Sequence, residues 1–231
     1  ADIPESIGVC VGRNGTGAIV QTGGSISDAN FTLAQFEGSV GNYELHDGSI
    51  SGEWLFVGRR GTGTFIQAGG TVNMSAVGLS PVDLEGALYQ LDDGVLQVSE
   101  LDIGVGGGSA KFIQNGGICS AGHLGMGLRA TAVLSGGTMD ISDGMELTGT
   151  LDFADTAFGL SLDGGLVDLS RGTIAGSTNA ALTVGPDSLT LVAPGFDPHA
   201  AFGQFSTEGL LHVVGGDLNI PGGKTVRGRG V

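Results

Sequence analysis

The chain has 231 residues, of which 46 are glycine, and a formal net charge of −15 at pH 7. It carries only nine Lys and Arg, whereas binding to a phosphate backbone relies on clustered cations, so we expect no nucleic-acid partner. No apolar run approaches the ~20 residues of a membrane-spanning helix, so we expect no membrane insertion. Gly-Gly and Asp-Gly pairs alternate with short runs rich in Val, Ile, Leu and Thr, which predicts an all-β chain.

A repeat is visible from the N-terminus onwards, because "GTGAIVQTGG" at residues 15–24 returns as "GTGTFIQAGG" at residues 61–70. Aligning the chain on the second glycine of each Gly-Gly or Asp-Gly pair gives Gly24, Gly48, Gly70, Gly94, Gly117, Gly137 and Gly165, at intervals of 24, 22, 24, 23, 20 and 28 residues. Such intervals fit one coil of a β-solenoid, which buries its apolar face only by stacking on its neighbours.

The aligned columns alternate in polarity, as strands with one buried face do. Five residues before the second glycine, every coil has an apolar or aromatic residue: Ile19, Tyr43, Phe65, Tyr89, Phe112, Ala132 and Leu160. Two residues after it stand Ile26, Ile50, Val72, Leu96, Cys119, Met139 and Val167, and the next position is polar throughout. A third apolar segment follows, from Phe31 and Leu33 to Leu124 and Met126. The pattern predicts three short strands per coil.

A longer period of two coils is also present. "VGR" at residues 11–13 returns at 57–59 and becomes "IGV" at 103–105. In one column Gln21, Gln67 and Gln114 alternate with leucines. These glutamines share the parity of the apolar positions, so we expect them to point inside and to hydrogen-bond to the backbone of the Gly-Gly corner.

The predicted fold is therefore all-β, a single-domain parallel β-solenoid over residues 1–231. We expect about seven regular three-strand coils of 20–28 residues in residues 1–175. Residues 176–231 lose the regular register and are expected to form irregular coils, as a cap or as a link to a following segment. Parallel crossover connections favour a right-handed helix.

The phrase "GxGxGxFxQxGGxV", preceded by "LxVG", resembles the repeats of large secreted bacterial surface proteins, including autotransporter-passenger-like and adhesin-like β-solenoids. The resemblance covers roughly residues 8–175 and transfers no catalytic residue. It implies export to the cell surface or the extracellular space. We expect a non-enzymatic structural or adhesive module whose partner is a surface glycan or another surface protein. The alternatives are a polysaccharide-binding or polysaccharide-cleaving β-helix and a self-assembling extracellular fibre subunit.

A carbohydrate site would need aromatic and acidic side chains on one outer face. The candidates for ligand contact are Glu53, Trp54, Asp92 and Asp102. Calcium would bind around Asp92, Asp93 and Asp102, but no pattern supplies the six to eight oxygens that Ca²⁺ needs, so we expect no cofactor.

Asp47 and Asp93 share a column two coils apart, which would separate them by ~9.6 Å and suit a pair of glycosidase carboxylates. Both precede glycine, where Asp favours turns, and we therefore interpret them as turn residues.

One outward column contains Val20, Ile66, Ile113 and Val133 where other coils have polar residues. This stripe is either an exposed surface for a partner or a strip covered by corner loops, and the sequence leaves both open.

Cysteine and histidine usage is sparse. Cys10 and Cys119 stand four to five coils apart, or ~20 Å, beyond the reach of a disulfide, so we expect two unpaired thiols that pack as small core side chains. The four histidines, His46, His123, His199 and His212, lack metal-ligand spacing and are expected to lie on the surface.

Overall fold

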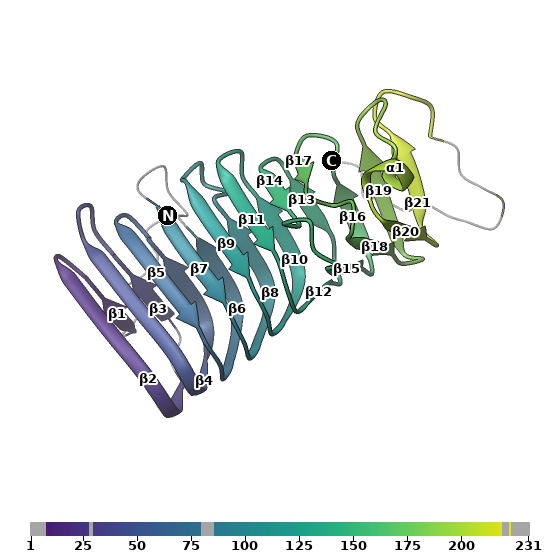
Figure 1. Cartoon of the computed structure of the whole chain (residues 1–231). Helices are drawn as coiled ribbons and strands as arrows, with labels where there is room; N and C mark the ends of the chain where they lie inside the picture. Colours follow the sequence, from purple (N-terminus) through teal and green to yellow (C-terminus); the bar gives the residue numbers. More distant parts are fainter. Residues whose placement is uncertain (1–7, 28–29, 80–85, 219–221, 223–231) are drawn as a thin grey trace.

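The protein winds into a parallel β-solenoid of about nine turns (Figure 1). The computed structural model describes residues 8–27, 30–79, 86–218 and 222. Strands make up 60% of the structure and helix 2%, which confirms the predicted all-β solenoid. No helix in the described part of the chain is both long enough and apolar enough to span a membrane.

Each full coil contributes one strand segment to each of three parallel walls, and the long strands bend from one wall into the next. The first wall consists of the N-terminal half of β2 (Thr16–Ser27), the start of β4 (Val40–Val57), β5 (Thr62–Gln67), β7 (Ala87–Leu91), β9 (Ala110–Gln114), β11 (Ala130–Leu134), β14 (Thr150–Asp152) and β17 (Thr173–Ala175). The second wall consists of the rest of β2, the middle of β4, the first halves of β6 (Thr71–Leu79), β8 (Val95–Ile103) and β10 (Ile118–Met126), then β12 (Thr138–Ile141), β15 (Gly159–Leu162), β18 (Ala181–Val184) and β20 (Gln204–Thr207). The third wall consists of β1 (Val9–Val11), β3 (Asn30–Leu33), the ends of β4, β6, β8 and β10, then β13 (Met145–Leu147), β16 (Gly165–Asp168), β19 (Ser188–Val192) and β21 (Leu210–Val213).

The predicted register holds through six coils. In the second wall Ile26, Ile50, Val72, Leu96, Cys119 and Met139 lie opposite one another in succession. The seventh alignment is wrong, because Met139 lies opposite Leu160 and Met145 lies opposite Val167. Gly165 begins a third-wall strand and so belongs to the corner between the second and third walls, whereas the other six glycines stand between the first and second. The predicted interval of 28 residues therefore runs from a glycine at one corner to a glycine at a different corner.

The six correctly aligned glycines stack at one corner in left-handed backbone conformations. Gly94 has φ +90°, and a Cβ added to it would lie 2.3 Å from the carbonyl oxygen of Gly70 in the preceding coil. Only glycine therefore fits both the backbone angle and the close approach between coils. The Oδ1 atoms of Asp47 and Asp93 each accept a hydrogen bond from the next glycine N–H at 2.7 Å, which agrees with their interpretation as turn residues.

The interior is a stack of side chains from successive coils. Tyr43, Phe65, Tyr89 and Phe112 are fully buried, with centroid separations of 5.1, 4.8 and 5.7 Å between successive rings. Ala132 follows them in the same column. Stacked and offset ring pairs add to the stabilisation that burial provides.

The buried glutamines explain the period of two coils. Each donates its amide N–H to carbonyl oxygens at the glycine corner, as Gln67 Nε2 does to Gly70 O at 3.2 Å and to Val95 O at 3.0 Å. The amide oxygen of Gln67 accepts a hydrogen bond from the Tyr89 hydroxyl of the next coil at 2.7 Å, and Tyr43 donates to Gln21 in the same way. The prediction of inward, corner-bonded glutamines is confirmed. The hydrogen bond from the tyrosine of the following coil was not predicted from the sequence.

The C-terminal coils are more regular than expected. β18 to β21 continue the second and third walls in parallel register. In chain order, α1 (Pro198–Ala201) replaces the first-wall strand of the last coil. Asp197 caps the helix by accepting a hydrogen bond from the backbone N–H of His199, and Pro198 occupies the first turn, where its missing N–H costs no hydrogen bond.

Candidate functional site

Two pairs of outward side chains, one aromatic and one acidic, lie in line on the outer face of the third wall. Trp54 and Phe56 stack with a centroid separation of 5.6 Å and an interplanar angle of 11°, and Arg59 lies over the Phe56 ring at 5.4 Å. Both aromatic rings are partly exposed. We call Trp54 and Phe56 the aromatic shelf.

Two coils further along the same face lie two carboxylates. Trp54 pairs with Ala76, which pairs with Glu100, and Phe56 pairs with Gly78, which pairs with Asp102. With about 4.8 Å between neighbouring strands, the aromatic shelf and the acidic pair are about 9.6 Å apart along the solenoid axis. Ala76 and Gly78 lie between the two pairs. Along the axis, this face therefore presents two aromatic rings, two small residues and two acids in succession.

Asp102 is the partly buried member of the pair. Burial raises the pKa of its carboxyl, the neighbouring Glu100 carboxylate raises it further, and His123 in the next coil acts in the opposite direction. A Cβ added to Gly125 would lie 2.6 Å from Asp102 Oδ1, so the carboxylate occupies space that a glycine leaves open. The arrangement holds one partly buried carboxyl beside one exposed carboxylate.

Asp92 is held in a different place, at the corner between the first and second walls. Gln90 donates its amide N–H to both Asp92 carboxylate oxygens at 2.9 Å, and Asn115 Nδ2 donates to Asp92 Oδ1 at 2.7 Å. Ser135 Oγ donates to Asn115 Oδ1 at 2.9 Å, so the network crosses three coils. These amides bind both oxygens of Asp92 within the protein, and Asp92 has a role in joining the coils.

The four predicted contact residues are therefore divided. Trp54 and Asp102 share the outer face of the third wall, and Glu53 is exposed immediately before Trp54 in β4. Asp92 and Asp93 lie on another corner, away from Asp102. Over the residues that the structure describes, no group of three or more His, Cys, Asp or Glu side chains could hold a metal ion. The arrangement gives no support to a calcium site built from Asp92, Asp93 and Asp102.

The outward stripe is interrupted. Along the first wall Val20 is followed by Glu44, Ile66, Gln90 and then Ile113, which pairs directly with Val133. Val20 is 57% exposed, whereas Ile66, Ile113 and Val133 are partly buried. Only Ile113 and Val133 are adjacent, so the four residues do not form one continuous apolar surface.

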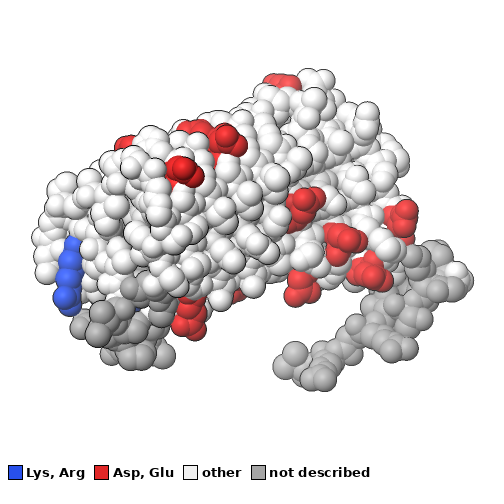
Figure 2. Space-filling view, turned by 90° about the horizontal axis from the view of Figure 1, so that it is seen from below, with Lys and Arg blue, Asp and Glu red and all other residues white. Residues whose placement is uncertain are grey.

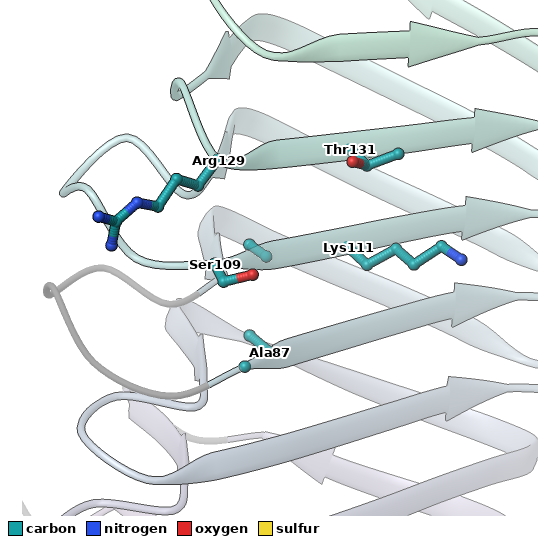
Figure 3. Close-up of a pocket in the computed structure, with 7 residues that line it drawn as sticks. Ala87, Ser109, Lys111, Arg129 and Thr131 are labelled. Carbon is teal, nitrogen blue, oxygen red and sulfur yellow. The ribbon is translucent and has the colours of Figure 1, made fainter.

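A pocket of about 320 Å³ lies on the first wall near the starts of β7, β9 and β11 (Figure 3). The residues that line it are Gly86, Ala87, Ser109, Ala110, Lys111, Arg129 and Thr131. Figure 3 shows the side chains of Lys111 and Arg129 pointing in opposite directions. Two cations that diverge do not enclose an anion, so the pocket lacks the converging polar groups of a small-molecule site.

Both thiols are free, as predicted. Cys119 is fully buried in the second-wall column, and burial raises the pKa of its thiol to about 12, with a smaller contribution from Asp140. Cys10 is exposed, so its assignment to the core is wrong. Val11 is buried and Val9 partly buried on either side of Cys10, and strand alternation turns the cysteine outwards.

Two of the four histidines, His46 and His199, are exposed, and the other two are partly buried. His46 lies 3.3 Å from Glu44 on the outer face of the first wall.

Sequence reasoning missed Phe56, Glu100 and His123. A signal was present, because Glu100 and Asp102 follow Trp54 and Phe56 by 46 residues, the same interval that separates the two "VGR" phrases. Comparison of the chain with protein-family profiles, curated proteins and solved structures finds no match.

Proposed function

We propose that the chain is a non-enzymatic structural module of an exported protein, a rigid β-solenoid that holds other parts of a surface or extracellular assembly at a fixed distance. The observation that carries the proposal is the continuous fit of each coil to the next. Aromatic rings, glutamine–tyrosine hydrogen bonds and a glycine ladder all join neighbouring coils. At about 4.8 Å per coil, about nine turns give a rod of roughly 40 Å.

The mechanical argument follows from the direction of the bonds. Strands of one coil pair with strands of the coils before and after it, so backbone hydrogen bonds run along the solenoid axis in three walls at once. Bending the rod would stretch one wall and compress the stacked side chains behind another. A close-packed interior resists such deformation.

Export is the second part of the proposal, and it rests on the resemblance of the repeat phrase to secreted surface proteins. Its test is separate from that of the scaffold. An antibody against the chain should label intact cells of the source organism or its culture medium. Signal that appears only after the cells are lysed would refute export.

The scaffold proposal is tested with a glycan array and product analysis on the purified chain, with and without calcium, together with small-angle X-ray scattering. The expected result is a rod-like scattering profile and no cleavage of any polysaccharide. Cleavage of a bound glycan would overturn the non-enzymatic assignment, and a profile of a flexible chain would overturn the rigid scaffold.

Polysaccharide recognition is the second candidate function, and the aromatic shelf with its acidic pair favours it. A flat aromatic surface offers its face to the apolar side of a sugar ring, while carboxylates accept hydrogen bonds from hydroxyls. If the array shows binding, Trp54→Ala should abolish it. Leu88→Ala, which changes a partly buried residue on the outer face of the first wall, is the matched control and should leave binding unchanged.

A further inference from the structure

Among the strands that the structure describes, those at the two ends of the solenoid pair on one side only. At one end β1 pairs only with β3 and β2 only with β4, and at the other β20 pairs only with β18 and β21 only with β19. Figure 1 shows these strands at opposite ends of the rod. Within the described ranges, each end therefore presents strand edges without a neighbouring strand, and such edges are sites for pairing with another chain.

In the part of the chain that the structure describes, the interior columns end in exposed side chains at the last coil. Leu211 lies opposite Thr190 and Val213 opposite Val192, so both stand in the inward columns of the third wall. They are nevertheless 41% and 44% exposed, whereas Val192, one coil earlier, is 1% exposed. The last coil has the apolar side chains that a further coil would bury.

The N-terminal end has the matching columns. Val9 and Val11 lie opposite Phe31 and Leu33 at the start of the same third-wall columns. Ile26 begins the second-wall column that Phe205 ends. All pairings along the solenoid are parallel, so the N-terminal edge of a second copy meets the C-terminal edge of the first in the same orientation that every internal coil uses.

Among the described residues, the charged side chains nearest the two ends differ in sign. Within residues 8–27, all of them described, Arg13 is the single charged side chain. Residues 181–218, also fully described, hold the acids Asp187, Asp197, Glu208 and Asp217 and no Lys or Arg. The view in Figure 2 shows a cation at the left end, the side of the first coils, and acidic side chains along the length of the rod, several of them toward the right.

We propose that the partner of the C-terminal end is the N-terminal end of a second copy of this chain, so that the protein assembles head to tail into fibres. In the contact, β20 and β21 pair with the second-wall part of β2 and with β1 of the next copy. Leu211 then lies over its partly buried Val9, and Val213 continues the column of Val11, which is already buried within its own copy. Asp217 follows β21 at the corner where Arg13 follows β1, so opposite charges meet.

The contact is restricted to two walls. α1 replaces a strand in the first wall of the last coil, so the first-wall part of β2 finds no strand edge there. A head-to-tail contact between identical copies does not close on itself unless the rotation forms a ring, and translation along a rod produces an open filament. The association therefore grows with concentration and does not stop at a dimer.

The test is sedimentation velocity of the full 231-residue chain over a wide range of concentrations at low and high salt, with electron microscopy of the largest species. We expect the mass of the sedimenting species to increase with protein concentration and high salt to weaken the association. Electron microscopy should show fibres one solenoid wide. Val213→Asp should raise the dissociation constant at least about tenfold. Val105→Asp, at a residue 55% exposed in a corner of the fourth coil, is the control and should leave association unchanged.

Charge reversal separates the proposed pair from a general effect of charge. Arg13→Glu and Asp217→Arg should each weaken association, and the two together in one chain should restore it. A chain that stays monomeric throughout, a series that stops at a dimer, or equal effects of Val213→Asp and Val105→Asp would overturn head-to-tail assembly. None of these outcomes bears on the scaffold proposal, which requires only a rigid single copy.

Discussion

The hydrogen bond between Tyr89 and Gln67 is the sharpest test of the interior. Tyr89→Phe removes one oxygen atom from a fully buried ring that stacks on Phe65 with a centroid separation of 4.8 Å. The ring and its packing remain. What is lost is the 2.7 Å bond to Gln67 Oε1, which lies in a side chain that is 0% exposed.

The expected cost follows from what remains in the interior after the substitution. A buried acceptor without a donor costs about 1–3 kcal/mol, more than the net value of an ordinary hydrogen bond. Gln67→Leu places in this coil the residue that neighbouring coils have in the same column, but it leaves the Tyr89 hydroxyl buried without an acceptor. Gly70 O keeps its bond from the backbone N–H of Val95 at 2.9 Å, so the orphaned hydroxyl dominates the cost.

The double variant Gln67→Leu, Tyr89→Phe removes both partners and should cost less than the sum of the single variants by about 1–2 kcal/mol. The assay is equilibrium unfolding in urea followed by circular dichroism, with unchanged m-values as the condition for comparison, because repeat arrays can unfold in parts. Coupling below about 0.5 kcal/mol would refute the reasoning, since distant sites add within that range.

The chain contains its own control for this cycle. Gln114 Oε1 is buried without a hydrogen-bond partner, because Ala132 stands where Tyr43 and Tyr89 stand after the other two glutamines. Gln114→Leu therefore orphans no hydroxyl and should cost less than Gln67→Leu. Equal costs at the two positions would show that the tyrosine bond contributes little.

Three further predictions test the stack, the buried thiol and the glycine ladder, all by urea unfolding. Phe65→Ala should cost about 3–5 kcal/mol and more than Phe112→Ala, because Phe65 stacks on rings at both sides and Phe112 at one. Burial raises the pKa of Cys119 from 9.0 to about 12, so stability should be constant below about pH 9 and fall above it as the unfolded thiol ionises; a neutral thiol reagent should label it only after unfolding. Gly94→Ala should destabilise more than Gly24→Ala, since both have positive φ but a Cβ at Gly24 meets nothing within 4 Å.

The interior could be predicted because each coil places residues of the same kind at the same positions as the coil before it. Ile26 to Met139 form one column in the sequence and one ladder in the structure. The error at Gly165 has a physical cause. Glycine occupies more than one type of corner, and the alternation of apolar and polar residues looks the same on either side of each. Aligning on glycine alone therefore moved Leu160 into the wrong wall.

The outer face was predicted in part, for a related reason. Trp54 and Asp102 lie on the same face, whereas Asp92, which was named from the sequence as a candidate for the same site, lies at a corner between two other walls. In a solenoid, ten residues cross a corner and reach a different wall, whereas 46 residues return to the same wall two coils later. The residues that share a surface are those separated by whole coils, as Trp54 and Glu100 are.

The inward and outward positions differ in how far the neighbouring coils restrict them. An inward residue such as Phe65 must fit the residue above and below it, so its type is predictable once the register is known. An outward residue is less restricted by the coils on either side, so its type is harder to predict from the register. The intervals of 22 and 24 residues that bring Trp54 to Glu100 are both confirmed by the strand pairing, which places the aromatic shelf and the acidic pair on one face. Substitution of either Trp54 or Asp102 should therefore weaken the binding of a ligand to the outer face, whereas substitution of Asp92 should affect binding only by lowering the stability of the fold.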